Sequence, residues 1–145
     1  MFKPALTLVL TLGIATAALA HSGVKNAAVK ARMNLMVEIK EATGVIGGMA
    51  QGKMAFDATK AAAAQQALLA ASQKVVAAFE AEETDPKSEA AARIWTDWDG
   101  FVTEANALEA AAGALQTASL DDLRAGLRDI GKSCGGCHMT YRIDK

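Results

Sequence analysis

The residues with the clearest chemical potential lie near the carboxyl end of the chain. Cys134, Cys137 and His138 form the pattern C-x-x-C-H, which is typical of a covalent attachment site for c-type haem. Residues three and four positions apart share one face of a helix. Two thiols can therefore reach two vinyl groups along one edge of a haem, while the imidazole turns onto the iron. The intervening Gly135 and Gly136 leave room for the macrocycle to lie close to the backbone.

Three other kinds of site use similar residues, and each fits the sequence less well. A redox dithiol places C-x-x-C at the start of a helix, usually after a strand, whereas this motif ends a helical pattern. A zinc site needs four ligands, but the chain has two cysteines, and its only histidine besides His138 is His21. A structural disulfide would leave His138 without a role. The sequence therefore favours haem attachment.

The first twenty residues have the features of an export signal. Lys3 supplies a positive charge, residues 6–18 form an apolar run, and residues 18–20 match a small-x-small cleavage pattern. The run is short for a membrane span, and nothing later in the sequence resembles one; an uncleaved anchor is the alternative. We expect a cleaved signal peptide at residues 1–20 and a mature domain at residues 21–145. Such a signal on a c-type haem protein indicates the bacterial periplasm.

Composition indicates the fold class and excludes one class of partner. The length of 145 residues suggests a single domain. Hydrophobic residues make up 52% of the chain, many of them alanine, and Pro86 is the only proline after the signal, which favours an all-helical protein. The formal net charge is −1, or −2 once Lys3 is removed with the signal. Because no basic stripe is present, nucleic acid is not an expected partner.

Periodicity predicts four helices, over about residues 24–49, 57–79, 94–115 and 119–141. Asp57 and Ser119 are the expected N-caps of the second and fourth, and the acidic stretch 80–89 is expected to be a loop. The expected inner faces are Val24, Ala28, Ala31, Leu35, Ile39, Ile46 and Met49; Leu68, Ser72, Val75 and Phe79; Ile94, Trp98, Phe101, Ala105, Leu108, Ala112 and Leu115; and Leu120, Leu123, Leu127, Ile130, Cys134, Cys137 and Tyr141.

Short connections between these helices favour an antiparallel up-down-up-down four-helix bundle. Because Cys134 and Cys137 continue the inner face of the fourth helix, we expect one covalently bound haem to be enclosed by the bundle.

Together these features resemble the class II c-type cytochromes, the family of cytochrome c′ and its low-spin relative cytochrome c-556. The resemblance covers the whole mature chain. It rests on the position of the C-x-x-C-H motif on the fourth helix, followed by Tyr141 and Arg142, and on residues 32–36, 52–57 and 94–101. It implies one haem c between the helices, with His138 as the proximal iron ligand.

The resemblance also indicates what lies on the distal side of the iron. Aligning the first helix by Arg32 puts Met36 at the position where the low-spin relatives have an iron-binding methionine and cytochrome c′ has a non-ligating apolar residue. Met33 is a rival ligand, and ordinary core filling is the commonest use of a helical methionine. Ligation by His138 and Met36 would leave no site for a gas, so the predicted function is one-electron transfer between larger redox proteins.

A five-coordinate iron is the alternative, and it would make the protein a binder of nitric oxide or carbon monoxide. A peroxidase-like enzyme would need distal acid–base groups such as a second histidine, but His21 is at the mature terminus, so no enzymatic activity is expected. The resemblance also permits a homodimer formed through the first two helices.

Two arginines are candidate partners of the haem group. Arg32, one turn before Met36, could reach a haem propionate, and Arg142, one turn after His138, could border the imidazole, as the arginines of the family do at these places. The alternative for each is a solvated surface charge.

Overall fold

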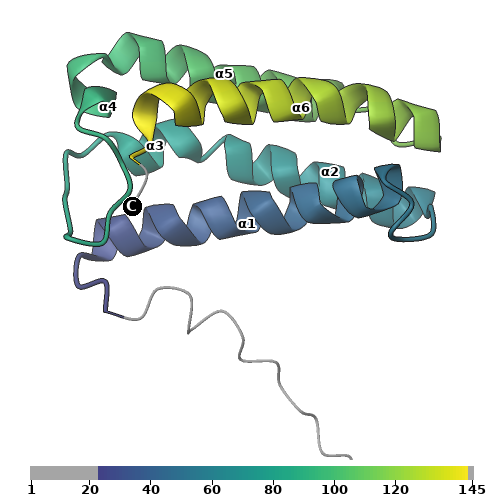
Figure 1. Cartoon of the computed structure of the whole chain (residues 1–145), viewed down its shortest axis with the longest axis horizontal. Helices are drawn as coiled ribbons and strands as arrows, with labels where there is room; N and C mark the ends of the chain where they lie inside the picture. Colours follow the sequence, from purple (N-terminus) through teal and green to yellow (C-terminus); the bar gives the residue numbers. More distant parts are fainter. Residues whose placement is uncertain (1–22, 144–145) are drawn as a thin grey trace, which may run out of the picture.

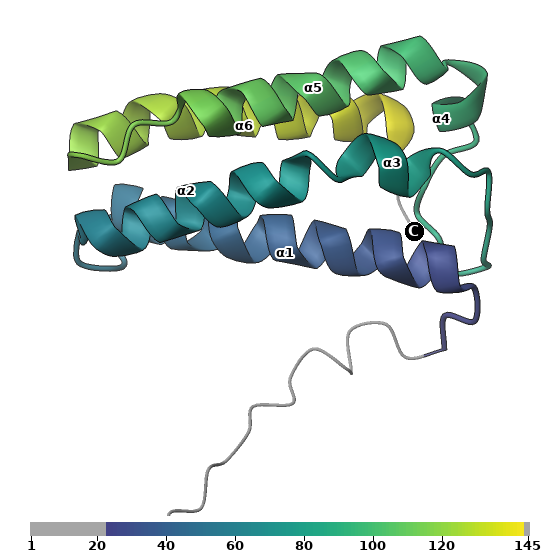
Figure 2. The same ribbon diagram turned by 180° about the vertical axis from the view of Figure 1, so that it is seen from behind.

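Six helices make up the part of the chain that the computed structural model describes, residues 23–143. In chain order they are α1 (Ala27–Ala50), α2 (Ala58–Ser72), α3 (Val75–Phe79), α4 (Arg93–Thr96), α5 (Trp98–Ala114) and α6 (Leu120–Tyr141). The four longer helices run alternately in opposite directions (Figure 1, and from behind in Figure 2). Helix α1 packs against α2 and α6, and α5 packs against the same two helices. The predicted all-α, up-down-up-down four-helix bundle is confirmed.

The expected signal peptide at residues 1–20 lies outside the described residues. Among residues 23–143, no helix combines the length and the apolar character that a membrane span requires.

Polar side chains cap the first turns of α1, α2 and α6. Asp57 Oδ1 accepts from the backbone N–H of Lys60 at 3.0 Å. Ser119 Oγ accepts from the N–H of Asp122 at 3.1 Å and donates to the carboxylate of Asp122 at 2.7 Å. Both predicted N-caps are therefore confirmed. The cap of α1 is Asn26, whose Oδ1 accepts from Val29 N–H at 3.0 Å, so the first helix begins three residues later than periodicity predicted.

Two of the predicted helices are interrupted in the structure. The second breaks between α2 and α3, where Ser72 Oγ donates to the carbonyl of Leu69, a side-chain bond that often bends a helix. The third breaks at Asp97, whose φ of −134° and ψ of 52° lie outside the helical region. There the Asp97 carboxylate accepts from Tyr141 at 2.9 Å. The buried faces nevertheless continue across both breaks, because Ser72, Val75 and the predicted inner residues from Phe101 onward are buried, although Trp98 is only partly buried.

The inner face of α1 differs from the prediction in its first two turns. Ala31 is exposed, and the buried row starts instead at Val29 and continues through Arg32 to Leu35. From Leu35 onward the predicted face is correct. A search for apolar residues alone could not predict this buried row, because one of its residues is an arginine.

Tyr141 anchors the end of α6 to the start of α5. Its ring is 5% exposed and meets the ring of Phe101 edge-on, with centroids 5.5 Å apart. Burial, and then the hydrogen bond to Asp97, raise the pKa of the Tyr141 hydroxyl above its ordinary value of 10. Tyr141 is the only tyrosine of the chain, so its contribution can be isolated by one substitution.

We expect Tyr141→Phe to lower the melting midpoint by a few degrees at pH 7, because the hydrogen bond to Asp97 is lost. The folded wild type holds the phenolic proton more tightly than the unfolded chain does. Its stabilisation is therefore complete below pH 10 and is lost as the pH rises through the raised pKa. Melting curves between pH 7 and 11 should show that the difference in melting midpoint between wild type and Tyr141→Phe becomes smaller above pH 10. A difference that stays constant would contradict this assignment.

Candidate haem site

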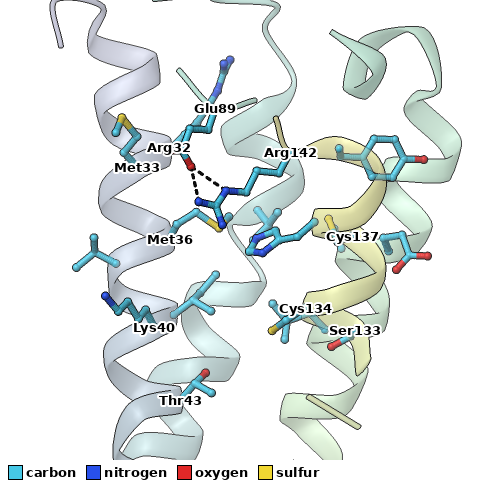
Figure 3. A pocket seen from close by; sticks show the side chains of 18 of the residues that line it. Arg32, Met33, Met36, Lys40, Thr43, Glu89, Ser133, Cys134, Cys137 and Arg142 are labelled. Carbon is cyan, nitrogen blue, oxygen red and sulfur yellow. Dashed lines mark hydrogen bonds and ion pairs between the residues drawn. The ribbon is translucent and has the colours of Figure 1, made fainter. Parts of the chain in front are cut away.

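A large cavity, partly open to solvent, lies between α1 and α6, with further walls from α3, α4, α5 and the segment before α4. Its volume is about 840 Å³, within the range of about 300–1,000 Å³ for ligand pockets. In Figure 3, Met33, Met36 and Lys40 extend from α1 on one side, and Cys134 and Cys137 belong to α6 on the other. Most of the lining is apolar, including Val29, Val37, Ile39, Val75, Phe79, Ile94, Phe101, Leu108 and Leu127. A large, flat, mainly apolar group fits this cavity.

The three residues of the C-x-x-C-H motif all border the cavity. Cys134 and Cys137 are half-buried, and neither forms a disulfide. Burial raises the pKa of the Cys134 thiol. The pKa of Cys137 is raised to about 11, first by burial and then by the carboxylate of Glu104 and by Cys134. These shifts disfavour the thiolate, in contrast to the low-pKa thiolate of a redox dithiol.

His138 is suited to bind a metal through a neutral ring. Its pKa is lowered mainly by partial burial and next by the charge of Arg142, while Glu89 acts in the opposite direction. A lowered pKa favours the uncharged imidazole, which is the form that coordinates iron. The side chain still keeps much of its surface exposed, so the cavity wall desolvates only part of the ring.

The antiparallel course of α1 and α6 brings the early part of one helix beside the late part of the other. Met36 and His138 consequently border the same cavity although they lie 102 positions apart in the sequence. Met33 borders it as well. Met36 is half-buried and also packs against the hydrophobic core. Lys40, one turn after Met36, brings a positive charge to the same wall.

Arg32 is not a solvated surface charge, because only 3% of the residue is exposed. Its Nε donates to the carbonyl of Ala78 and its Nη1 to that of Glu83, both at 2.8 Å, and Nη2 donates to the carbonyl of Ala81. Burial lowers the pKa of Arg32, and the carboxylate of Glu83 opposes this effect. Three of its five N–H donors are thus committed to the backbone, and the residue still borders the cavity.

Aromatic rings flank the guanidinium of Arg32. Its central carbon lies 5.1 Å from the ring centre of Phe79 and 5.3 Å from that of Trp95, within range of cation–π attraction. Trp95 Nε1 in turn donates to the carbonyl of Phe79 at 2.8 Å. Trp95 lies in the stretch 94–101 on which the family resemblance rests, but the sequence assigned it no role. The structure places it against the buried arginine.

Arg142 forms an ion pair inside the cavity wall. Its Nε and Nη2 both lie 2.7 Å from Oε2 of Glu89, as the dashed lines in Figure 3 indicate. Both side chains are only partly exposed, at 46% and 42%. Arg142 is also close enough to influence the pKa of His138. Glu89 was missed by sequence reasoning because one acid in an acidic loop carries no signal of its partner.

Comparison with known proteins gives a consistent result. The family model for cytochrome c′ matches residues 27–142. Cytochrome c-554 from Cereibacter sphaeroides is 34% identical, over 96% of this chain and 95% of its own length. Cytochrome c-556 from Agrobacterium tumefaciens is 31% identical, over 79% of this chain and 94% of its own. A solved cytochrome c′ from Rhodobacter Spheriodes superimposes with a TM-score of 0.75 at 30% identity, over 81% and 96% of the two chains.

These relatives identify the cofactor as haem c. A cavity of suitable size, with two cysteines on its wall, is consistent with that group. The chain belongs to the cytochrome c′ family of class II c-type cytochromes, and it is a mono-haem protein whose haem c is attached covalently through two thioethers.

Proposed function

We propose that this cytochrome is a one-electron carrier whose haem iron is low-spin, with His138 as proximal ligand and Met36 as distal ligand. The observation that carries the proposal is that Met36 and His138, on two antiparallel helices, border one cavity. Cys134 and Cys137 are the proposed thioether positions, since they are the only cysteines of the chain and both border that cavity. When bound, the haem supplies an iron that cycles between its ferrous and ferric states.

The residues of the chain have separate roles in this proposal. Cys134 and Cys137 hold one edge of the haem, and the neutral imidazole of His138 is available to the iron. Met36 offers a soft thioether from a flexible side chain, a ligand that raises the reduction potential of c-type haem. The mainly apolar lining lowers the polarity around the haem and so also favours the less charged ferrous state. With both axial positions taken, the protein exchanges electrons with larger redox proteins and binds no gas.

The second candidate function is binding of nitric oxide or carbon monoxide at a five-coordinate iron. It is favoured by the likeness to a solved cytochrome c′, the branch of the family for which a non-ligating distal residue is expected. In that case Met36 would serve as core packing, as its contact with the hydrophobic core allows.

The proposed setting is the bacterial periplasm. It rests on the charged, apolar and small-residue pattern of residues 1–20, with cleavage before His21. A homodimer through α1 and α2 remains part of the proposal, on the resemblance to the family alone. Electron transfer through the haem would need no catalytic residue, so no enzymatic activity is proposed.

Visible spectra of the purified wild type, with and without carbon monoxide, test the two functions against each other. We expect the reduced protein to be low-spin, with a sharp split band, and to change little under carbon monoxide because Met36 already fills the distal position. A reduced protein that is high-spin and binds carbon monoxide readily would replace the electron-carrier proposal with the gas-binding one.

A further inference from the structure

We propose that the loop at residues 80–92 braces α1 against α6, and that Arg32 and Glu89 are positioning residues that set the separation of the two iron ligands. The loop connects α3 to α4. The inference rests on the proposed ligation by Met36 and His138, because it describes how these residues are kept in place. The test below separates the failure of one proposal from the failure of the other.

Helix α1 holds the first half of the loop. The guanidinium of Arg32 donates to the carbonyls of Ala78, Ala81 and Glu83, as described above. The backbone N–H groups of Lys25 and Asn26, just before α1, donate to the carboxylate of Asp85 at 2.8 and 3.1 Å. A carboxylate at this position also interacts favourably with the helix dipole.

Helix α6 holds the second half of the loop. The carboxylate of Glu89 pairs with Arg142, and the carbonyl of Glu89 accepts from the N–H of Ile143 at 2.8 Å. The N–H of Ala91 donates to the carbonyl of Tyr141 at 2.9 Å, and an isolated antiparallel bridge joins Ala90 to Arg142. The end of α6 is therefore fastened to the loop by both backbone and side-chain bonds.

The positions of the two arginines connect this loop to the iron ligands. Arg32 lies one helical turn before Met36, and Arg142 lies one turn after His138. Both arginines bind the chain between Ala78 and Glu89. Glu89 and the next residue, Ala90, also border the cavity. Figure 3 shows Arg32 on α1, and the ion pair between Arg142 and Glu89, at the same end of the cavity.

A brace is needed here because the cavity separates the two helices at the level of the ligands. Helices α1 and α6 contact each other elsewhere, but beside Met36 and His138 a space of about 840 Å³ lies between them. A bond between the iron and Met36 nevertheless requires α1 to stay at one distance from α6, which carries the haem. A loop of thirteen residues would lose much conformational entropy on ordering, and its bonds to both helices offset that cost. Loosening either attachment should let the sulfur of Met36 leave the iron more often.

The test compares haem-loaded wild type with Arg32→Lys, Glu89→Gln and the double variant. Lysine keeps the charge of Arg32 but cannot hold three carbonyls at once. We expect the rate at which carbon monoxide binds the ferrous protein to rise on the order of tenfold in Arg32→Lys. A rise of up to about fivefold is expected in Glu89→Gln, which removes a half-exposed ion pair. Because loss of either attachment releases the same brace, the double variant should gain less than the product of the two factors.

Hydrogen exchange on the same proteins provides a readout that does not depend on iron ligation. Arg32→Lys should speed amide exchange at the far attachment, residues 138–143, and Glu89→Gln should speed exchange in the first turns of α1. Glu82→Gln and Arg128→Lys are the matched controls, since both residues are exposed and Glu82 lies in the same loop. Neither control should change the carbon monoxide rate or the exchange of the distant segment.

The outcomes separate the two proposals. If the wild type is high-spin but the variants speed amide exchange at the distant attachment, the brace is retained and ligation by Met36 is overturned. A low-spin wild type whose variants match the controls in both readouts overturns the brace and retains the electron carrier. The brace is also overturned if amide exchange changes only beside the mutated residue. It is overturned as well if the increase in the carbon monoxide binding rate of the double variant equals the product of the two single increases. If Arg32→Lys does not fold, Glu89→Gln, which changes a half-exposed carboxylate, decides the question by the same criteria.

Discussion

Replacing Cys134 and Cys137 together with alanine is expected to leave little folded protein. Without thioethers the haem is not retained, and the bundle must then close or hydrate a space of about 840 Å³. Unfilled apolar space on this scale is strongly destabilising, and the total stability of a typical domain is only about 5–15 kcal/mol. Partial collapse of the helices would reduce this cost.

Far-ultraviolet circular dichroism and thermal melting of periplasmic material measure this effect. The matched control is Met139→Ala, which alters an 87% exposed residue inside the same helical turn and should behave as wild type. The wild-type mass should equal residues 21–145 plus one haem that acid-acetone does not extract. A double cysteine variant with unchanged helicity and melting would show that the haem does not support the fold.

Met36→Ala is expected to turn the haem from low-spin to high-spin and to open its distal face. Loss of the thioether removes the competitor for the sixth position, so the affinity for carbon monoxide should rise on the order of a hundredfold, or about 2.7 kcal/mol. The visible spectrum of the reduced protein and a carbon monoxide titration measure both changes. The reduction potential should fall, because a methionine ligand favours the ferrous state.

Met33→Ala is the matched control for this substitution. Met33 borders the same cavity from the same helix, one turn earlier. Its substitution by alanine removes the same atoms as Met36→Ala does. Its spectrum and its carbon monoxide affinity should stay close to wild type. If Met33→Ala produced the spectral change and Met36→Ala did not, the distal ligand would be Met33.

The bundle could be predicted because its signals are local and repetitive. Leu123, Ile130 and Tyr141 fall on one face of α6 and are buried as the spacing requires. The same spacing predicted that Cys134 and Cys137 would border the interior, which the structure confirms. Caps at Asp57 and Ser119 were also readable, since a side-chain oxygen binds an N–H only three residues away.

The features that sequence reasoning missed depend on contacts between distant segments. Arg32 is buried because three carbonyls of α3 and the loop after it, about fifty residues later, converge on it, and no periodic pattern carries that information. The carboxylate of Asp97, at the interruption, accepts a hydrogen bond from Tyr141, 44 positions away. The pairing of Glu89 with Arg142 likewise requires the path of the 80–92 loop. Charged residues in such places look like surface residues until the fold brings their partners to them.

X-ray absorption at the iron edge of the wild-type protein tests the central claim most directly. The account predicts one sulfur atom in the first coordination shell of the iron, beside nitrogen atoms from the haem and His138, in both the ferric and the ferrous states. The sulfur contribution should disappear in Met36→Ala and persist in Met33→Ala. A wild-type iron with five nitrogen ligands and no sulfur would contradict ligation by Met36, and with it the electron-carrier function proposed for this cytochrome.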